Sequence, residues 1–471
     1  MIPIQDHTSV NENRLQAGAA RVDITPPPGT LINGDFFPHR ASFIHDRLYA
    51  KALVLQNGAM RLVFVVVDIC VMPIAYTTQV RQRIAAQTGI PFEHILISTT
   101  HTHAAGSVSV VHLTDPDPQY SVALPGLICQ AVEEAMAQCR PAKIGFGCVQ
   151  VPEHVLCRRY FMKPGFVSLN PVNGRAEPVR TNPIGAAAFI EKSAGPVDPD
   201  VGFMAVQGVD GEWISVLANY SLHYVGDWDH GTISSDYFGE FAAQLQQLLH
   251  TGDRFVAIMS NGTSGDINCW DFLHPERYPA EPFQKSKLIA GEIANRVHAA
   301  LQHIQWEENP LLDVHYNEIT LRLRKSTAEE AAAAAVIMQQ TDYTKLDIND
   351  EGLQKIYARE QALLFEYPDT MQYPLQVFRI GPGMIGGLSG ELFAETGLWI
   401  KANSPVPAYF TIGLANGNAG YIPTTYQMTL GGYETWRCRY SNLQEDAEDI
   451  IKKEFLALLG KTKAVVSLAQ R

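Results

Sequence analysis

Short runs of apolar residues along the chain predict buried β-strands. Residues 62–67 read Leu-Val-Phe-Val-Val-Val, and residues 95–97 read Ile-Leu-Ile. A run that is apolar on both faces is typical of a central strand in a sheet that helices cover on both sides. An Asn-Gly pair at residues 57–58 favours a tight turn, so a hairpin is predicted between the first run and a strand over residues 43–55.

Segments with apolar residues three or four positions apart alternate with these strands and predict amphipathic helices. The clearest of them cover residues 73–88, 124–139, 237–250, 282–303 and 446–459. This alternation predicts the α/β class, with a mixed β-sheet core and flanking helices. Because no repeat, compositional break or linker interrupts the pattern, we expect a single large catalytic domain over residues 17–471, preceded by a flexible N-terminal segment over residues 1–16.

The composition restricts the partners and the location of the protein. With 471 residues, 46% of them hydrophobic, the chain can bury a large core, and its net charge of −13 argues against binding to nucleic acid. Seven cysteines without a CxxC pair indicate a reducing compartment. There is neither a run of about eighteen apolar residues nor a secretory signal, so we expect a cytoplasmic protein without a transmembrane helix. No feature of the pattern predicts an oligomeric state.

A pair of histidines follows the apolar strand predicted over residues 94–100. In an extended strand residues i and i+2 face the same side, so His101 and His103 can enter one pocket. Two imidazoles at the carboxyl end of a strand suit a metal ion, a general base, or one of each. An isolated pair of this kind is equally typical of polar loop residues, so its interpretation depends on the rest of the chain.

Further exits from apolar segments carry side chains that can bind a metal. His223, Glu391 and Tyr421 each follow such a segment and stand among small residues, which let a substrate approach the backbone. Two histidines and a carboxylate form a common ligand set for catalytic zinc, which keeps one position open for water. The long gaps between these residues match no local zinc signature. Asp68 also ends a strand, where it could serve the site or cap the next helix.

A series of short motifs extends in a fixed order along almost the whole chain. It comprises Asp-Ile-Thr-Pro at residues 23–26, the segment 45–52, Val-Asp-Ile-Cys at 67–70, Thr-His-Thr-His at 100–103, Asn-Tyr-Ser-Leu-His at 219–223, Gly-Asp at 265–266, Gly-Glu at 390–391 and the span 420–433. In this order the motifs resemble the catalytic domain of the neutral ceramidase (neutral/alkaline non-lysosomal ceramidase) family. The chain stops soon after its last predicted helix, so the C-terminal immunoglobulin-like domain of ceramidases is not expected.

The resemblance implies a metal site and neighbouring functional residues. The implied ligands of one Zn²⁺ per chain are His101, His223, Glu391 and Tyr421. His103 would lie beside the metal, and Tyr433 occupies the position of a second tyrosine of the family, twelve residues after the tyrosine ligand. In the long segment over residues 152–196, Arg158 matches an arginine of the family best, with Arg159 as the alternative. A surface ion pair is the other interpretation of Arg158.

One position departs from the family's pattern. Where the glycine–aspartate loop of ceramidases continues to a serine implicated in catalysis, this chain has Asn268. An amide cannot act as a nucleophile, although it can donate a hydrogen bond to a developing oxyanion. Ser264 stands nearby in the sequence.

We therefore predict a zinc-dependent hydrolase that cleaves a linear amide (N-acyl) bond of a small-molecule or lipid-like substrate through metal-activated water. In this hypothesis His103 acts as the base or as an oxyanion partner. Tyr433 and Arg158 stabilise the tetrahedral intermediate. Asp68 or Asp266 orients a histidine ligand.

Two other functions remain alternatives. One is a zinc esterase or cyclic-amide hydrolase that acts on a small polar substrate. The other, motivated by Asn268, is a metal-binding homologue without turnover. Among the remaining histidines, His45 is a candidate for the pocket wall. His230 and Asp236 follow His223 closely and are candidates for a lid or for a contact that supports the ligands.

Overall fold

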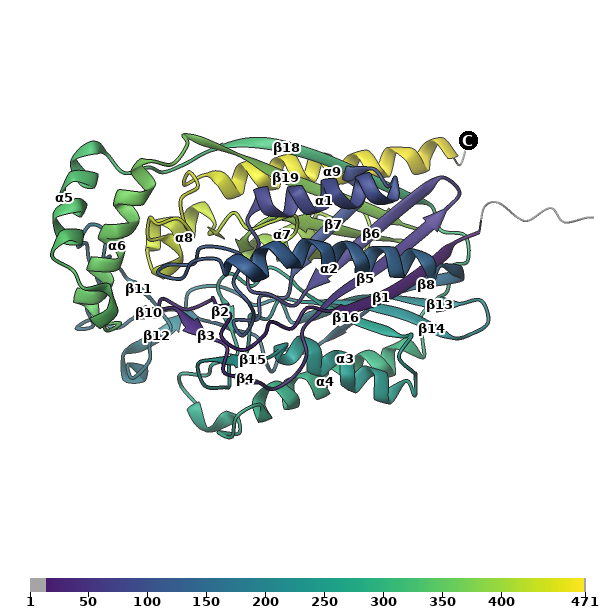
Figure 1. Ribbon diagram of the computed structural model, residues 1–471, viewed down its shortest axis with the longest axis horizontal. Helices are drawn as coiled ribbons and strands as arrows, with labels where there is room; N and C mark the ends of the chain where they lie inside the picture. The colour runs from purple at the N-terminus through teal and green to yellow at the C-terminus, as the bar shows by residue number, and fades with distance from the viewer. Residues whose placement is uncertain (1–13, 470–471) are drawn as a thin grey trace, which may run out of the picture.

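The computed structural model describes residues 14–469 of the chain, and its largest element is an eight-stranded sheet (Figure 1). In spatial order the strands are β16 (Val256–Asn261), β14 (Trp213–Tyr220), β13 (Asp200–Gly208), β8 (Arg140–Gln150), β1 (Gln16–Asp23), β5 (Tyr49–Asn57), β6 (Met60–Val67) and β7 (Ile95–Thr99). The two outermost pairs, β6–β7 and β14–β16, are parallel, and the pairs between them are antiparallel. The predicted mixed sheet is therefore confirmed.

Helices cover one face of this sheet (Figure 1), so the expectation of helices on both sides is corrected. They are α1 (Ile74–Thr88) and α2 (Pro118–Ala137) over one half of the sheet, and α3 (Asp236–Leu248) and α4 (Gln284–Leu301) over the other. Along β6, Val63 and Val65 pack in one hydrophobic cluster with α1 and α2, whereas Leu62 and Phe64 face the interior of the protein. This alternation explains why the run is apolar at every position.

A second sheet packs against the interior face of the first. Its strands, in order, are β18 (Leu312–Arg322), β19 (Thr370–Ile380), β20 (Gly383–Leu388) and β22 (Ala408–Ile412). Phe378 of β19 and Phe410 of β22 share a cluster with Phe64 of β6, so the two sheets are joined by one hydrophobic core. Helices α7 (Ala394–Ala402) and α9 (Ala447–Ala469) lie on the side of the second sheet, and residues of both belong to clusters in this half of the protein.

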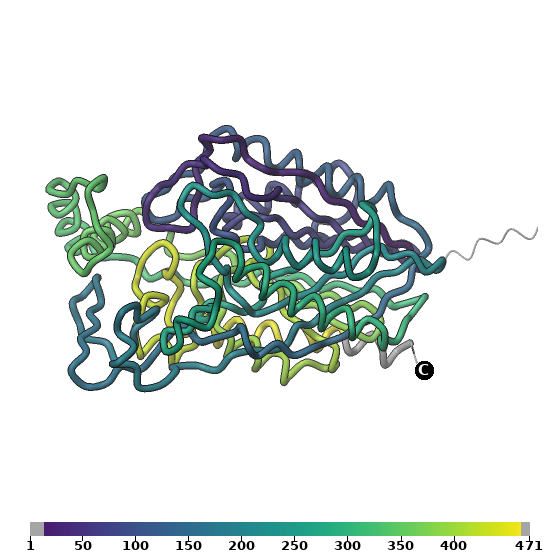
Figure 2. Tube along the Cα trace, turned by 90° about the horizontal axis from the view of Figure 1, so that it is seen from below, coloured from purple at the N-terminus to yellow at the C-terminus, as the bar shows by residue number. Residues whose placement is uncertain are grey.

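Two helices extend from one end of the molecule. α5 (Ala328–Gln339) and α6 (Asp350–Phe365) connect β18 to β19, and both Figure 1 and Figure 2 show them projecting beyond the sheets. α5 begins at Thr327, whose hydroxyl accepts a hydrogen bond from the backbone of Glu330 while the Glu330 carboxylate accepts one from the backbone of Thr327. This capping box satisfies two backbone donors at the start of the helix.

The described residues begin and end close to the predicted domain boundaries. Residues 1–13 of the predicted flexible segment lie outside the described residues, whereas Leu15 is buried and Gln16 already belongs to β1. At the other end, α9 is the last element of the described residues. None of the described helices has the length and apolar character that crossing a bilayer requires.

Candidate metal centre and active site

Four separate elements deliver the predicted metal ligands to one place. His101 follows β7, and His223 follows β14. Glu391 and Tyr421 begin two short parallel strands, β21 (Glu391–Leu392) and β23 (Tyr421–Ile422), in which they are direct partners. The Asn261 amide at the end of β16 donates a hydrogen bond to the carbonyl of Thr100, which joins the ends of two strands from opposite edges of the sheet.

His101, His223 and Glu391 present their side chains to a common point. One ligand atom from each residue lies within 4.8 Å of the others. Nε2 of His101 is 3.4 Å from Oε2 of Glu391, and Nε2 of His223 is 3.8 Å from the same oxygen. All three side chains are buried. Two imidazole nitrogens and a carboxylate oxygen are donors that suit Zn²⁺.

Backbone carbonyls set the orientation of both histidines. Nδ1 of His101 lies 2.9 Å from the carbonyl oxygen of Cys70, and Nδ1 of His223 lies 3.0 Å from that of Ser264. A carbonyl only accepts hydrogen bonds, so each Nδ1 carries a proton and each Nε2 is the ring nitrogen that faces the common point. The expectation that an aspartate orients a histidine ligand is therefore corrected, because carbonyl groups of the strand exits do so.

The charges within this cluster fit a bound cation. Oε2 of Glu391 is buried and has no hydrogen-bond partner among the described residues, which is costly for a carboxylate. Burial opposes a proton on His101, but the Glu391 carboxylate raises the pKa of this histidine well above its ordinary value. Burial and the Arg158 charge lower the pKa of His223. A divalent cation would satisfy the carboxylate and both imidazole nitrogens together, so these residues fit the metal that the resemblance implies.

Tyr421 lies beside the cluster in a charged environment. Its backbone is paired in register with Glu391, and its ring lies 5.4 Å from the guanidinium carbon of Arg158. Burial and the Glu391 charge raise the pKa of the Tyr421 hydroxyl well above its usual range, while Arg158 opposes this shift. Tyr421 therefore remains a candidate ligand, held beside the three residues that converge.

His103 connects the metal-ligand cluster to an open cavity. Its Nε2 lies 3.2 Å from Nε2 of His101, and its ring stacks on Tyr224 with the ring centroids 3.6 Å apart. Both residues line a cavity of about 260 Å³, together with Trp228 and Trp270. Burial and the neighbouring His101 lower the pKa of His103 well below its ordinary value, which leaves a neutral imidazole that can accept a proton.

The structure distinguishes the two neighbouring arginines. Arg158 donates from Nε to Oε1 of Glu434 (2.8 Å) and from Nη2 to the carbonyl of Gly265 (2.6 Å), and it faces Tyr421. Arg159 donates to the other oxygen of Glu434 (2.6 Å) and to Oε1 of Gln427. Its guanidinium carbon lies 5.1 Å from the centre of the Phe393 ring. Both guanidinium groups are buried, so neither forms a surface ion pair. Arg158 is the one that reaches the site.

Tyr433 is held by a histidine that the sequence patterns did not indicate. Its hydroxyl lies 3.1 Å from Nε2 of His112, and its ring centroid lies 5.5 Å from that of Tyr421. His112 stacks on Phe36 at 4.2 Å and has a positive φ of 47°. It follows no strand and belongs to no motif, so a lone histidine in a loop was the only signal available.

A comparison with known families decides the relationship of the chain. The family model described as neutral/alkaline non-lysosomal ceramidase, N-terminal, matches residues 16–269, which is more than half of the 471 residues. The chain belongs to this family. The matched segment includes His101, His103, Arg158 and His223. No curated protein matches the sequence.

Solved ceramidase structures share the fold over nearly the whole chain. A structure described as ceramidase complexed with C2 has 18% sequence identity and a TM-score of 0.68, and the alignment covers 96% of this chain and 76% of that one. Neutral ceramidase from Pseudomonas aeruginosa has 19% identity and a TM-score of 0.66, with 95% and 74% covered. At these identities the comparison shows a common fold, and its coverage extends well beyond the segment matched by the family model.

Asn268, which stands where ceramidases have a serine, forms hydrogen bonds within the surrounding loops. Asn268 donates from Nδ2 to Oδ1 of Asn182 (2.8 Å) and accepts a hydrogen bond from the backbone of Trp270 (3.1 Å). Asp266 accepts from the backbone of Ala394, the first residue of α7 (2.8 Å). These bonds hold loops in place, and none of them orients a metal ligand.

The other acidic and histidine candidates have separate contacts. Asp68 pairs with the buried Lys51 at 3.0 Å, so it neither caps the next helix nor contacts a ligand histidine. Asp236 accepts from the backbone of Val225 at 2.8 Å and thereby supports the segment that follows the ligand His223. The ring of His45 stacks on that of Phe283, with a centroid distance of 3.5 Å.

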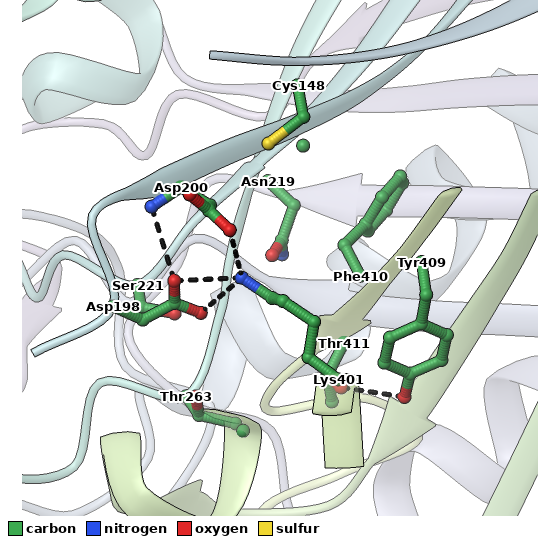
Figure 3. A pocket seen from close by; sticks show the side chains of 12 residues that line it. Cys148, Asp198, Asp200, Asn219, Ser221, Thr263, Lys401, Tyr409, Phe410 and Thr411 are labelled. Carbon is green, nitrogen blue, oxygen red and sulfur yellow. Dashed lines mark hydrogen bonds and ion pairs between the residues drawn. The ribbon is translucent and has the colours of Figure 1, made fainter. Parts of the chain in front are cut away.

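A second enclosed cavity is too small for a substrate. Figure 3 shows Lys401 between Asp198 and Asp200, with nitrogen–oxygen distances of 2.7 and 2.9 Å. The cavity that these residues line has a volume of about 20 Å³, which accommodates about one water molecule. The cavity of about 260 Å³ beside His103 is larger than this one and adjoins the metal-ligand cluster.

Proposed function

We propose that this protein is a zinc-dependent hydrolase that cleaves a linear N-acyl amide bond. The observation that supports it most is the buried Oε2 of Glu391, which accepts no hydrogen bond from the described residues and faces Nε2 of both His101 and His223. Membership of the neutral ceramidase family supports amide hydrolysis as the reaction. In this proposal His101, His223, Glu391 and Tyr421 hold one Zn²⁺ per chain.

Each neighbouring side chain has a separate task in this reaction. The bound zinc would polarise the substrate carbonyl and make a water molecule more acidic. His103 is neutral, lies beside the ligands and opens onto the cavity, so it accepts the proton that the attacking water loses and returns it to the departing amine. Arg158 and Tyr433 lie on the Tyr421 side and donate hydrogen bonds to the oxyanion that develops from the carbonyl.

The lining of the cavity suggests which amides can enter. Trp228 and Trp270 provide apolar walls for an acyl chain or another apolar group, so a small-molecule or lipid-like amide fits. The mouth also carries Asp35 and Asp229. This polar rim supports a second candidate function, an esterase or cyclic-amide hydrolase for a small polar substrate. We further propose a cytoplasmic location, supported by seven free cysteines, five of them buried.

Substrate profiling of the purified zinc form tests the reaction. The panel comprises linear N-acyl amides with short and long acyl chains, matched esters and cyclic amides. We expect the linear amides to be cleaved with the highest kcat/KM. Preferred cleavage of esters or cyclic amides would support the second candidate instead. No turnover on any substrate by protein with stoichiometric zinc would favour a metal-binding homologue.

Metal analysis of variants tests the site itself. His101→Ala and Glu391→Ala should each lose zinc and reduce turnover by at least about 1,000-fold, because each removes a proposed ligand. His303→Ala, an exposed histidine after α4, is the matched control and should retain both zinc and activity. Unchanged zinc content in both ligand variants would contradict the assignment.

A further inference from the structure

A second group of metal-binding side chains lies at the mouth of the substrate cavity. Asp35, His39 and His230 each offer a ligand atom within 4.8 Å of the other two. Oδ2 of Asp35 lies 2.9 Å from Nε2 of His39 and 3.6 Å from Nδ1 of His230. All three residues line the same cavity as His103, and Asp229 adds another carboxylate to its wall.

The backbone holds these residues on two segments far apart in sequence. His39 belongs to β3 (His39–Arg40), which pairs with β2 (Leu31–Ile32), and Asp35 lies in the turn between these strands. His230 precedes Gly231, whose carbonyl accepts hydrogen bonds from the backbone of Ser42 and Phe43. Main-chain hydrogen bonds next to the cluster therefore hold the two segments together, independently of the three side chains.

The spacing of the ligand atoms is close to that of a tetrahedral zinc site. Zinc–nitrogen and zinc–oxygen distances of about 2.0–2.1 Å place neighbouring ligand atoms about 3.3 Å apart. The distances of 2.9 and 3.6 Å from Asp35 lie on either side of this value. The rings of His39 and His230 are stacked 4.0 Å apart and nearly parallel, so one must tilt to direct its nitrogen at the ion. His230 is free to do so because its side chain is 74% exposed.

We propose that Asp35, His39 and His230 form a second binding site for Zn²⁺, or for a divalent cation with the same preference for nitrogen and oxygen. The site binds more weakly than the buried cluster because it is partly exposed and one imidazole must reorient. Its ligands are distinct from His101, His223 and Glu391. The inference therefore does not depend on the proposed catalytic role of the buried site.

Occupancy of this second site would affect the cavity beside it. Gly34, next to Asp35, packs against the ring of His103, and Phe36 stacks on His112. An ion shared by Asp35 and His230 would fix the β2–β3 turn to the segment that carries His230, in the wall of the cavity that His103 also lines. We therefore expect zinc in excess of the first equivalent to reduce turnover reversibly.

Zinc and cobalt titrations of the full chain test the second site. The protein should bind a tight equivalent and a second, weaker one, and Co²⁺ at the second site should give its own visible absorption. The double variant His39→Ala/His230→Ala should keep the tight equivalent and weaken the second by at least about 100-fold. His274→Ala removes a similarly exposed histidine with a single carboxylate partner, so both equivalents should remain.

The outcomes separate this inference from the proposed function. In Glu391→Ala, loss of the tight equivalent with retention of the weaker one would support two independent sites. A chain that binds only the weaker equivalent would contradict the buried zinc site and leave the second one supported. Binding of the tight equivalent alone by the unaltered chain, or a weaker equivalent that persists in the double variant, would overturn the inference. The activity of each protein is expressed as a fraction of its own activity with one equivalent of zinc. Excess zinc should lower this fraction in the unaltered chain and leave it unchanged in His39→Ala/His230→Ala.

Discussion

The hydroxyl of Tyr433 lies 3.1 Å from Nε2 of His112, whose other ring nitrogen is buried without a partner among the described residues. Burial lowers the pKa of His112 to about 4, so the ring is neutral near pH 7. A proton on Nδ1 would have no acceptor, and the tautomer protonated on Nε2 is therefore favoured. Nε2 then donates to the Tyr433 oxygen, which leaves the tyrosine proton available to donate to the site.

This relationship predicts coupled effects at Tyr433 and His112. Tyr433→Phe should lower kcat by about 100- to 1,000-fold, the usual effect of losing an oxyanion donor. His112→Ala should lower kcat by about tenfold, because Tyr433 keeps its hydroxyl but loses the bond that orients it. In the double variant kcat should equal that of Tyr433→Phe. Fully multiplicative effects, measured with zinc content unchanged, would contradict the coupling.

The packing of Gly34 against His103 predicts an activity loss without metal loss. A Cβ atom at residue 34 would lie 2.5 Å from the His103 ring, at a backbone φ of 116°. Gly34→Ala should therefore displace His103 and lower kcat at least tenfold while zinc stays bound. Gly29→Ala is the control, because Gly29 also has a positive φ (90°) but no atom lies within 4 Å of the added Cβ. Equal losses in both variants would show that backbone strain alone is responsible.

The contrast between Arg158 and Arg159 predicts that one substitution affects catalysis and the other stability. Arg158→Lys keeps a charge near Glu434 but loses the fixed geometry of the donors that face Tyr421, so kcat should fall about 100-fold. Arg159→Lys disrupts a fully buried network with Glu434 and Gln427 and should cost about 3 kcal/mol of stability. Thermal unfolding and kcat of the folded fraction separate the two effects. A larger kcat loss in Arg159→Lys would reverse the assignment.

Burial raises the pKa of Asp266 from 3.8 to about 7, which predicts a pH-dependent stability. Between these values the folded protein binds a proton that the unfolded chain lacks, so this group's contribution to stability declines as the pH rises from about 4 through 7. Asp266→Asn lacks this decline while keeping an acceptor for the backbone of Ala394. The difference in unfolding temperature, the variant's value minus that of the unaltered protein, should therefore increase as the pH is raised from about 5 to about 8. A constant difference across this range would contradict the shifted pKa.

Local sequence patterns predicted much of the fold because they report burial. The all-apolar run of β6 reflects a strand packed between a helix layer and a second sheet. The predicted hairpin joins β5 to β6, but its turn lies at residues 58–59, one position after the predicted one, because Asn57 is still paired with Met60. The short β21 and β23 had no such signal. Their parallel pairing joins Glu391 to Tyr421 although α7 and β22 lie between them in the chain, and two residues per strand are too few to show a periodicity.

The same distinction applies to the candidate site. Residue types at strand exits indicated His101, His103, His223, Glu391 and Tyr421 as candidates, because ligands commonly bind at the carboxyl ends of strands, and the resemblance to the ceramidase family implied their roles. The sequence could not indicate that the carbonyls of Cys70 and Ser264 orient the histidines, or that His112 holds Tyr433 and Asp35 meets His230. The sequence by itself determined where the long strands and helices form, through periodicities that a few consecutive residues carry. Only the tertiary structure decided which exits meet and which way each imidazole points, because those contacts join residues far apart in sequence and depend on how the two sheets pack.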